Sequence, residues 1–478
     1  MKKITKLKND RYRPSYHVTA PTGWINDPNG FCYFKGYYHI FYQYHPDSPE
    51  WGPMHWGHAR SKDLVHWENL PIALTPGNPE DKDGCFSGSA IVKDDVLYLV
   101  YTGHHYYGDS DENHFWQNQN LAYSTDGITF TKYENNPIIA NPPEDSTHHF
   151  RDPKVWKYQD CYYLVLGSQE KDGLGCVLMY KSKDLKKWSY MGPLAKAKDL
   201  AGEGFMWECP DFFRLDSKDI LLISPQGIKA KAESYRNLYQ TGYFIGNYNY
   251  ESNLFKYDKF QELDSGHDFY AIQTTQAPDG RRLAFAWLNM WESQMLEQTD
   301  GWAGMLTLPR ELSLKDNNIY MKPVAELKEL RTKELVRESF AVNSVSKLIS
   351  NLKYAEIELN FDIVDFDGKF KLLFKSVTGK EVLTLSYVFG RQNNLILENS
   401  YRIGKRYAKV KSSDKISLQI FIDASSIEIF INDGEVVFSE RYFEESELKV
   451  ALSSNKDISG QVVAYELQTN AMTFPEHP

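Results

Sequence analysis

Three short acidic stretches, far apart along the chain, constrain its fold more than any other feature. They are residues 24–30 (WINDPNG), 151–153 (RDP) and 208–211 (ECPD), and each sets a carboxylate beside a proline at the start of a strand-like run. Asp27 and Asp152 lie about 125 residues apart, and Asp152 and Glu208 about 56. Both intervals are close to multiples of one unit of about 60 residues, and such a period is typical of repeat architectures.

The repeated unit is made of strands. Residues 96–101, 161–166 and 282–287 are apolar runs of strand length, and residues 31–42 are typical of two strands around a glycine turn. A second pattern recurs in residues 59–67, 122–130 and 180–188, where a strand is followed by an aspartate-containing turn and then by an aromatic residue. The first 310 residues are therefore expected to be a series of small antiparallel sheets.

Polar residues mark the start of each unit. At the repeat spacing these residues are Asp27, Ser87, Asp152, Glu208 and Asp268. In a propeller the innermost strands lie side by side along a central channel, so their first residues meet at one mouth. We therefore expect an all-β fold whose residues 1–315 form a five-bladed β-propeller. Carboxylates that meet in this way suit the paired acid–base chemistry of glycoside hydrolysis.

The pattern of apolar and polar residues changes after about residue 310. Residues 322–330 begin near a proline and favour a helix, which predicts a linker over residues 316–340. Residues 355–361 and 426–431 alternate apolar and polar side chains, and an Asn-Asp-Gly turn follows the second run. Alternation with such a turn is typical of an antiparallel sandwich, so residues 341–478 are expected to form a supporting β-sandwich domain.

Composition excludes several classes of function. The net charge is −10 without a long basic run, which argues against a nucleic-acid partner. The five cysteines are scattered without a C-x-x-C pair, so neither a zinc site nor a disulfide framework is expected. There is no apolar signal region and no 18-residue apolar run, which predicts a cytoplasmic protein without membrane association. The oligomeric state stays open.

The motifs together resemble glycoside hydrolase family 32, which comprises invertases, fructanases and bacterial sucrose-6-phosphate hydrolases. The resemblance rests on residues 24–30, 86–90 (FSGSA), 151–153, 207–211 (WECPD) and 268–271 (DFYA), and it extends to residues 421–428 near the C-terminus. It covers nearly the whole chain. It implies a five-bladed propeller followed by a β-sandwich, in agreement with the pattern of strands.

The resemblance also implies catalytic roles. Asp27 would be the nucleophile that attacks the anomeric carbon of a terminal β-fructofuranosyl unit, and Glu208 would be the acid and then the base, as in retaining glycosidases. Asp152 would stabilise the cationic transition state and hold ring hydroxyls, with Arg151 orienting it. Neither a metal nor an organic cofactor is expected.

Further positions match residues that line the fructose site in relatives. Aromatic residues would supply flat apolar faces for sugar C–H groups, and polar side chains would bind hydroxyls. The predicted substrate-binding residues are Trp24, Asn26, Gln43, Trp51, Phe86, Ser87, Arg151 and Trp291.

Other reactive residues are expected to be structural. Cys209 has no evident base partner, so a packed thiol is favoured over a nucleophile. The pairs His104-His105 and His148-His149 point to opposite faces if they lie on strands, so solvated loop histidines are favoured over metal ligands. The segment 104–119 is expected to be a loop that rims the mouth of the site and shapes the leaving-group position. For Asp268, bracing of the channel and substrate contact stay equally open.

The predicted function is hydrolysis of sucrose 6-phosphate or sucrose with retention of configuration. Alternatives in the same class are hydrolysis of short fructo-oligosaccharides and fructosyl transfer to sucrose. A related five-bladed pentosidase is disfavoured, because residues 207–210 and 86–89 are similar to the fructosidase branch. A non-catalytic sugar-binding propeller is the alternative from another class, and it would require the loss of one carboxylate.

Overall fold

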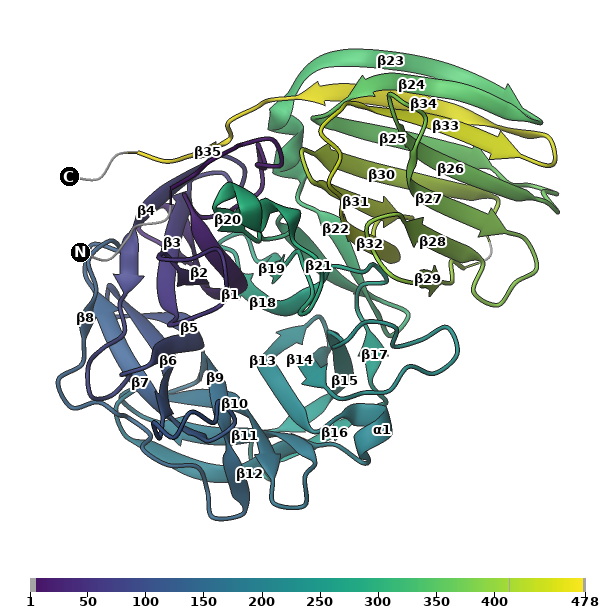
Figure 1. The fold of residues 1–478 in the computed structure, drawn as a ribbon. Coiled ribbons are helices and arrows are strands. Elements are labelled where there is room, and N and C mark those ends of the chain that lie inside the picture. Colours follow the sequence, from purple (N-terminus) through teal and green to yellow (C-terminus); the bar gives the residue numbers. More distant parts are fainter. Residues whose placement is uncertain (1–5, 412, 476–478) are drawn as a thin grey trace.

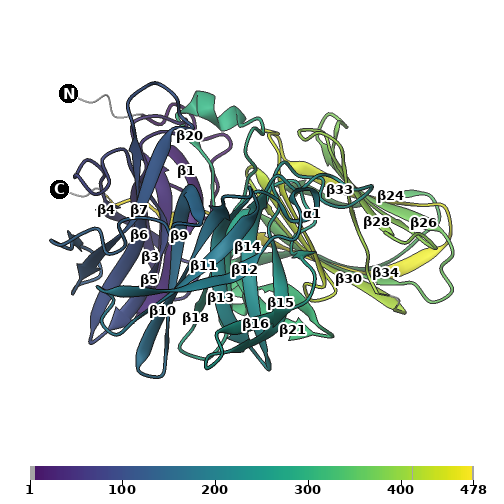
Figure 2. The ribbon, with the colours of Figure 1, turned by 90° about the horizontal axis from the view of Figure 1, so that it is seen from below.

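The computed structural model describes residues 6–411 and 413–475, whose regular secondary structure is almost entirely β-strand, arranged in seven sheets. Five sheets follow one another around a ring, and two pack face to face beside it (Figures 1 and 2). The prediction of an all-β fold is confirmed. The described helices are short, namely α1 (Leu200–Glu203), η1 (Leu296–Asp300) and η2 (Ala325–Leu330). No helix in this part of the chain is long and apolar enough to span a membrane.

The sheets of the ring are built from consecutive antiparallel strands. The first contains β1 (Gly23–Phe34), β2 (Tyr37–His45), β3 (His55–Ser61) and β4 (Trp67–Leu74). The second contains β5 (Gly84–Lys93), β6 (Val96–Tyr106), β7 (Phe115–Ser124) and β8 (Thr131–Lys132). The third contains β9 (Ser146–Tyr158), β10 (Cys161–Glu170), β11 (Gly175–Ser182) and β12 (Trp188–Lys196). The fourth contains β13 (Met206–Leu215), β14 (Lys218–Gln226), β15 (Gly242–Asn249), β16 (Leu254–Tyr257) and β17 (Gln261–Glu262). The fifth contains β18 (Tyr270–Gln276), β19 (Arg282–Trp287), β21 (Arg310–Lys315) and β22 (Asn318–Pro323).

The first strand of each sheet lines the centre of the ring. Strands β1, β5, β9, β13 and β18 each contact the next, and β18 contacts β1 again, so these strands form a closed circle. Strand β20 (Trp302–Ala303) follows the start of the fifth sheet and pairs in parallel with β1, which ties the last sheet to the first. Four of the five predicted polar starts lie on these inner strands, and Asp268 precedes β18 by two residues.

The recurring aspartate turn is confirmed. Asp63 accepts hydrogen bonds from the amides of Val65 and His66, at 2.9 and 2.8 Å. Asp126 and Asp184 accept the equivalent pair of amide bonds two and three residues further on. A short carboxylate that binds nearby amides stabilises a tight turn, so the same residue type ends the third strand in the first three sheets.

The two remaining sheets form the sandwich. One contains β23 (Arg331–Val342), β34 (Ile458–Leu467), β25 (Ala355–Asp362), β30 (Lys415–Asp423), β31 (Ser426–Ile431) and β32 (Val436–Arg441). The other contains β24 (Val345–Leu352), β33 (Leu448–Ser454), β26 (Lys369–Ser376), β27 (Glu381–Val388), β28 (Leu395–Asn399) and β29 (Lys405–Ala408). After the sandwich, β35 (Met472–Thr473) returns to the ring and pairs with β4 (Figure 1).

The predicted linker is mostly strand. Within residues 316–340, β22 completes the fifth sheet of the ring and β23 already belongs to the sandwich. Ile319 and Met321 alternate into the core of the ring, which explains why this segment pairs as a strand. The predicted helix over 322–330 is limited to the 3₁₀ helix η2.

A shared core joins the ring to the sandwich. Phe421, Phe430 and Val437 of the sandwich belong to the same buried apolar cluster as Phe285 and Leu308 of the ring. The interface also holds buried ion pairs, among them Arg310 with Glu428. A second cluster fills the space between the two sandwich sheets. Burial of the apolar cluster shared by ring and sandwich fixes the sandwich against one side of the ring.

Candidate active site

Proline and a break in strand pairing position each predicted catalytic carboxylate. The register between first and second strand shifts between Ile25 and Pro28 in β1, and between Glu208 and Asp211 in β13. The pairing of β9 with β10 shifts between Arg151 and Lys154, around Pro153. Proline lacks the N–H that a ladder requires, and a bulge bends the strand and redirects a side chain.

Asp27 lies at the centre of a small hydrogen-bond network. Its Oδ2 accepts a bond of 2.7 Å from the Ser87 hydroxyl, and its Oδ1 accepts one of 3.1 Å from the Asn26 amide. Burial, together with the nearby charge of Glu208, raises the pKa of Asp27 to about 6. A half-buried carboxylate held in this way is ionised at neutral pH and fixed in orientation.

Asp152 lies on β9, which β5 separates from β1, and its backbone is left-handed with φ 66°. The Cys209 amide donates a bond of 2.9 Å to its Oδ2. Burial raises the pKa of Asp152 to about 7. The charge of Arg151 acts against this rise, and the charges of Glu208 and Asp27 add to it. The Cys209 thiol lies between the acids, 3.5 Å from Asp27 Oδ2 and 3.7 Å from Asp152 Oδ2. Burial raises the pKa of this thiol well above its ordinary value, so it is a neutral donor.

Four hydrogen bonds from three side chains hold Glu208. Arg151 donates two of them to Oε1, from Nε at 3.0 Å and from Nη2 at 2.8 Å. Oε2 accepts a bond of 2.9 Å from Gln226 and one of 2.6 Å from the Tyr270 hydroxyl. The structure thus differs from the expectation that Arg151 orients Asp152, because its guanidinium binds Glu208 directly and reaches Asp152 only through its charge. Gln226 and Tyr270 were not anticipated from the sequence.

The three carboxylates face one cavity of about 210 Å³. Ten of the eleven residues predicted to bind or act on substrate line it, namely Asn26, Asp27, Gln43, Trp51, Phe86, Ser87, Arg151, Asp152, Glu208 and Trp291. They come from β1, β2, β5, β9, β13 and the loops that follow β2 and β19. Side chains more than 180 residues apart in the sequence are therefore brought together by the closed circle of inner strands.

Trp24 does not line this cavity. Its ring is buried and stacks on Trp291, with the ring centres 5.9 Å apart. Its indole N–H donates a bond of 2.8 Å to Asn26 Oδ1. Trp24 therefore lies behind Asn26 and Trp291, which line the cavity, and supports them, whereas a direct contact with substrate was expected.

Sequence reasoning missed several residues of the cavity wall. These are His104, Tyr106, Glu112, Phe115, Gln117 and His149. His104 pairs with Gln117 across β6 and β7, and Tyr106 pairs with Phe115. All four point to one face because side chains alternate along a strand. The alternation itself was a signal that this segment is a pair of strands.

The expectation of solvated loop histidines at residues 104 and 105 is wrong. Both are buried in β6, where His104 stacks on Phe86 at 4.2 Å and His105 stacks on Trp116 at 3.7 Å. Stacking on aromatic rings compensates for removing imidazole from water. The connecting loop is shorter than predicted and spans residues 107–114, from which Glu112 reaches the cavity.

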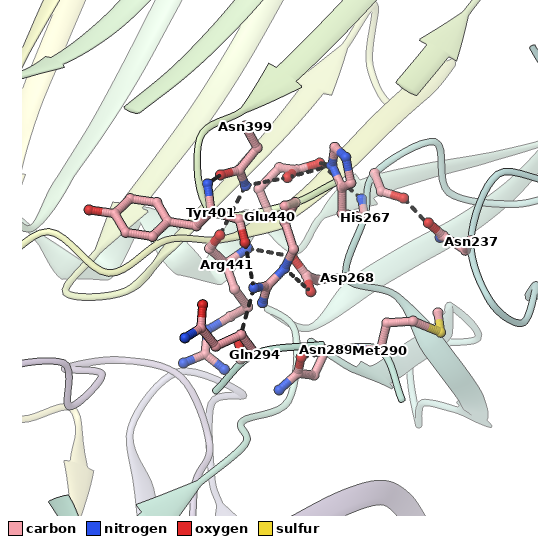
Figure 3. Close-up of polar contacts among 12 residues, drawn as sticks. Asn237, His267, Asp268, Asn289, Met290, Gln294, Asn399, Tyr401, Glu440 and Arg441 are labelled. Carbon is pink, nitrogen blue, oxygen red and sulfur yellow. Dashed lines mark hydrogen bonds and ion pairs between the residues drawn. The ribbon is translucent and has the colours of Figure 1, made fainter. Parts of the chain in front are cut away.

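Asp268 is distant from this chemistry. It is fully buried, and its carboxylate forms an ion pair of 2.9 Å with Arg402 of the sandwich. It also accepts a bond of 2.8 Å from the Arg441 amide, within the network of His267, Asn399 and Glu440 (Figure 3). Of the two alternatives for Asp268, the structure favours bracing. Within residues 6–411 and 413–475, no group of three His, Cys, Asp or Glu side chains could hold a metal ion.

The chain matches known proteins over nearly its whole length. Residues 17–323 match the N-terminal domain model of glycosyl hydrolases family 32, and residues 326–468 match the C-terminal one. The chain is 43% identical to a sucrose-6-phosphate hydrolase of Zymomonas mobilis, over 90% of this chain and 86% of that protein. It is 41% identical to one of Escherichia coli, over 94% of each chain. A β-fructofuranosidase of Bombyx mori, solved with sucrose, superposes with a TM-score of 0.88 at 43% identity, over 98% of this chain and 96% of that one.

Proposed function

Because this chain belongs to glycosyl hydrolases family 32, we propose that it is a retaining β-fructofuranosidase that releases terminal β-D-fructofuranosyl units. One observation carries the proposal: Asp27, Asp152 and Glu208, from three different inner strands, face a single cavity. Retaining glycosidases require two carboxyl groups about 5–5.5 Å apart on opposite sides of the scissile bond.

In the first step, Asp27 attacks the anomeric C2 of the fructosyl unit. The C2–O bond to the leaving group breaks, and Glu208 gives a proton to the departing oxygen. Three mutually repelling carboxyl groups share this cavity, and burial raises the pKa of Asp27 to about 6 and that of Asp152 to about 7. The cluster of carboxyl groups therefore binds protons more tightly than isolated carboxyl groups in water do.

In the second step, Glu208 takes a proton from water, and the resulting hydroxide oxygen attacks C2. The bond between C2 and Asp27 breaks, and the enzyme returns to its starting state. Asp152 remains outside the covalent chemistry. Its negative charge stabilises the cationic character that develops at C2 in both transition states.

The remaining lining residues orient the sugar. Asn26, Gln43 and Ser87 offer polar groups for ring hydroxyls, while Trp51, Phe86 and Trp291 offer apolar faces. Gln43 is held by a bond of 2.9 Å from its amide to the Cys85 carbonyl. Ser87 is held by its bond to Asp27, so binding of the sugar and orientation of the nucleophile are coupled.

We further propose that the five sheets of the ring are the blades of a five-bladed propeller, closed by the pairing of β20 with β1. The ring as far as β22 would form this catalytic domain, and the strands from β23 to β34 would form the sandwich domain. A cytoplasmic location is supported by the five cysteines, all of which are free thiols, as is usual in a reducing compartment. The substrate is sucrose or sucrose 6-phosphate, in line with the relatives named above.

The test is the stereochemistry of transfer to methanol. With sucrose as donor, retention gives methyl β-D-fructofuranoside, which NMR distinguishes from the α-anomer. The α-anomer as the first product would overturn the double displacement. Absence of any fructose release from sucrose and from sucrose 6-phosphate would overturn the proposed activity itself.

A further inference from the structure

A second cavity opens beside the catalytic one. It has a volume of about 670 Å³ and shares Trp51, Tyr106 and Glu112 with the catalytic cavity. The rest of its wall comes from Gly52 and Pro53, from Lys82 and Asp83 just before β5, and from the loop 107–114. If the fructosyl unit fills the inner cavity, as the proposed function requires, the group that leaves from C2 extends into this outer one.

Few cations are available along the two cavities. Taken together, the two walls contain two residues that are always cationic at neutral pH, namely Arg151 in the catalytic cavity and Lys82 in the outer one. Arg151 forms an ion pair with Glu208. Burial lowers the pKa of His104 to about 3 and that of His149 to about 2, with the charge of Arg151 adding to both shifts. Both imidazoles are therefore neutral near pH 7.

Lys82 is the remaining cation. Its side chain is exposed, and among the described residues no carboxylate is paired with its ammonium group. An ammonium on a flexible stem binds phosphate as a compact charge, and a sugar phosphate carries between one and a half and two negative charges near pH 7, roughly as a phosphorylated serine does.

The three acidic residues of the outer cavity differ in whether a backbone amide donates a hydrogen bond to their carboxylate. Asp83 accepts a bond of 2.8 Å from the Tyr106 amide, and Asp111 accepts one of 2.9 Å from the Asn113 amide. Glu112 is exposed and lines both cavities. The Glu112 carboxylate therefore faces the same space as the ammonium of Lys82, and among the described residues no backbone amide donates a hydrogen bond to it.

We propose that Lys82 is the residue that recognises a phosphorylated leaving group, and that Glu112 opposes it. Together the two charges set the preference between sucrose 6-phosphate and sucrose. This inference rests on the proposed function and assigns the part of the site that reads the leaving group. Lys82 acts on binding of the leaving group and takes no part in bond breaking at C2.

The test compares kcat/KM for sucrose 6-phosphate and for sucrose in the purified full-length protein. Lys82→Met keeps the length of the side chain and removes its charge, and Lys183→Met is the matched control. Lys183 is exposed and lines neither cavity. Lys82→Met should lower the ratio of the two efficiencies, phosphorylated over neutral, by about tenfold, as expected for loss of a charge-assisted hydrogen bond. Glu112→Gln should raise the ratio several-fold, and Lys183→Met should leave it unchanged.

Product inhibition gives a second readout. Glucose 6-phosphate should inhibit the wild type more strongly than glucose does, and Lys82→Met should abolish the difference. An unchanged efficiency ratio in Lys82→Met, with both substrates still hydrolysed, would overturn the role of Lys82 and leave the proposed function intact. A wild type that hydrolyses neither substrate would overturn both proposals.

Discussion

Replacement of Asp152 by Asn should stabilise the protein at neutral and alkaline pH. Asp152 is 6% exposed, and burial together with the charges of neighbouring carboxylates raises its pKa from 3.8 to about 7. In the unfolded chain the same group ionises freely near its ordinary pKa. The folded state therefore carries the cost of a buried charge at any pH where Asp152 is ionised. Asn keeps an oxygen that can accept the Cys209 amide bond and removes the charge.

The magnitude follows from the size of the pKa shift. A rise of about 3 units, at about 1.4 kcal/mol per unit, corresponds to about 4 kcal/mol. Unfolding entropy is roughly 2.1 cal/mol/K per residue, which gives about 1 kcal/mol/K for this chain. The expected rise in Tm for Asp152→Asn is therefore about 4 °C at pH 8 if the chain unfolds as one unit.

The pH dependence gives the sign of the effect. Because the folded pKa is raised, the folded state holds this proton more tightly than the unfolded one. The stabilising contribution of protonated Asp152 is complete below about pH 4 and is lost as the pH rises through about 7. The Tm difference between variant and wild type should therefore vanish near pH 4, grow between pH 4 and 7, and stay constant above that range.

Calorimetric melts at pH 4, 5, 6, 7 and 8 measure this difference directly. Asp126→Asn is the control with the opposite sign, because amide hydrogen bonds in its turn outweigh desolvation and lower the pKa of Asp126 to about 2. That variant should melt below the wild type at neutral pH. A Tm difference for Asp152→Asn that is negative at pH 8, or that does not change with pH, would refute the electrostatic account of the site.

Four further predictions concern activity and stability. Asp27→Asn and Glu208→Gln should fold with wild-type circular dichroism and lose roughly three or more orders of magnitude in kcat on sucrose; near-wild-type turnover in either would contradict the assigned roles. Because the nucleophile must be ionised and the pKa of Asp27 is raised to about 6, kcat/KM should fall about tenfold per pH unit below that value. Burial lowers the pKa of His17, but its bonds to Asp423 and Glu428 outweigh burial and raise it to about 9. Its stabilising contribution should be complete below pH 6.5 and lost as the pH rises through about 9, a loss that thermal melts of His17→Gln should not show. Prolonged dialysis against a chelator should leave activity unchanged, and a loss restored by a divalent cation would reveal a metal requirement.

Local patterns in the sequence predicted what depends on local structure. The runs 161–166 and 282–287 are strands because their apolar residues fill buried cores. The aspartate turns at residues 63, 126 and 184 form because a short carboxylate binds the amides that follow it. Motif spacing further predicted that Asp27, Asp152 and Glu208 would face one cavity, since equivalent positions on successive inner strands meet around the ring.

Contacts between sheets were not predictable in this way. The choice of Glu208 rather than Asp152 as the partner of Arg151 depends on distances between β9 and β13 that no local pattern encodes. The same holds for the bonds from Gln226 and Tyr270 to Glu208. The expected loop position of His104 set aside a metal site but did not anticipate its contact with β5, where the aromatic face of Phe86 makes its burial favourable.

The prolines next to the acids link the architecture of the ring to its chemistry. A regular inner strand would pair all its amides and would point alternate side chains toward its neighbours. Pro28, Pro153 and Pro210 each interrupt that pairing beside a carboxylate, and the backbone at Asp152 and Cys209 adopts left-handed angles of 66° and 47°. Such conformations are costly for residues other than glycine and persist only where the surrounding structure holds them. Here the closed circle of inner strands holds them. The strained positions at the channel mouth aim the Asp152 carboxylate and the Cys209 amide at each other, while the regular remainder of each strand supplies the stability that this arrangement requires.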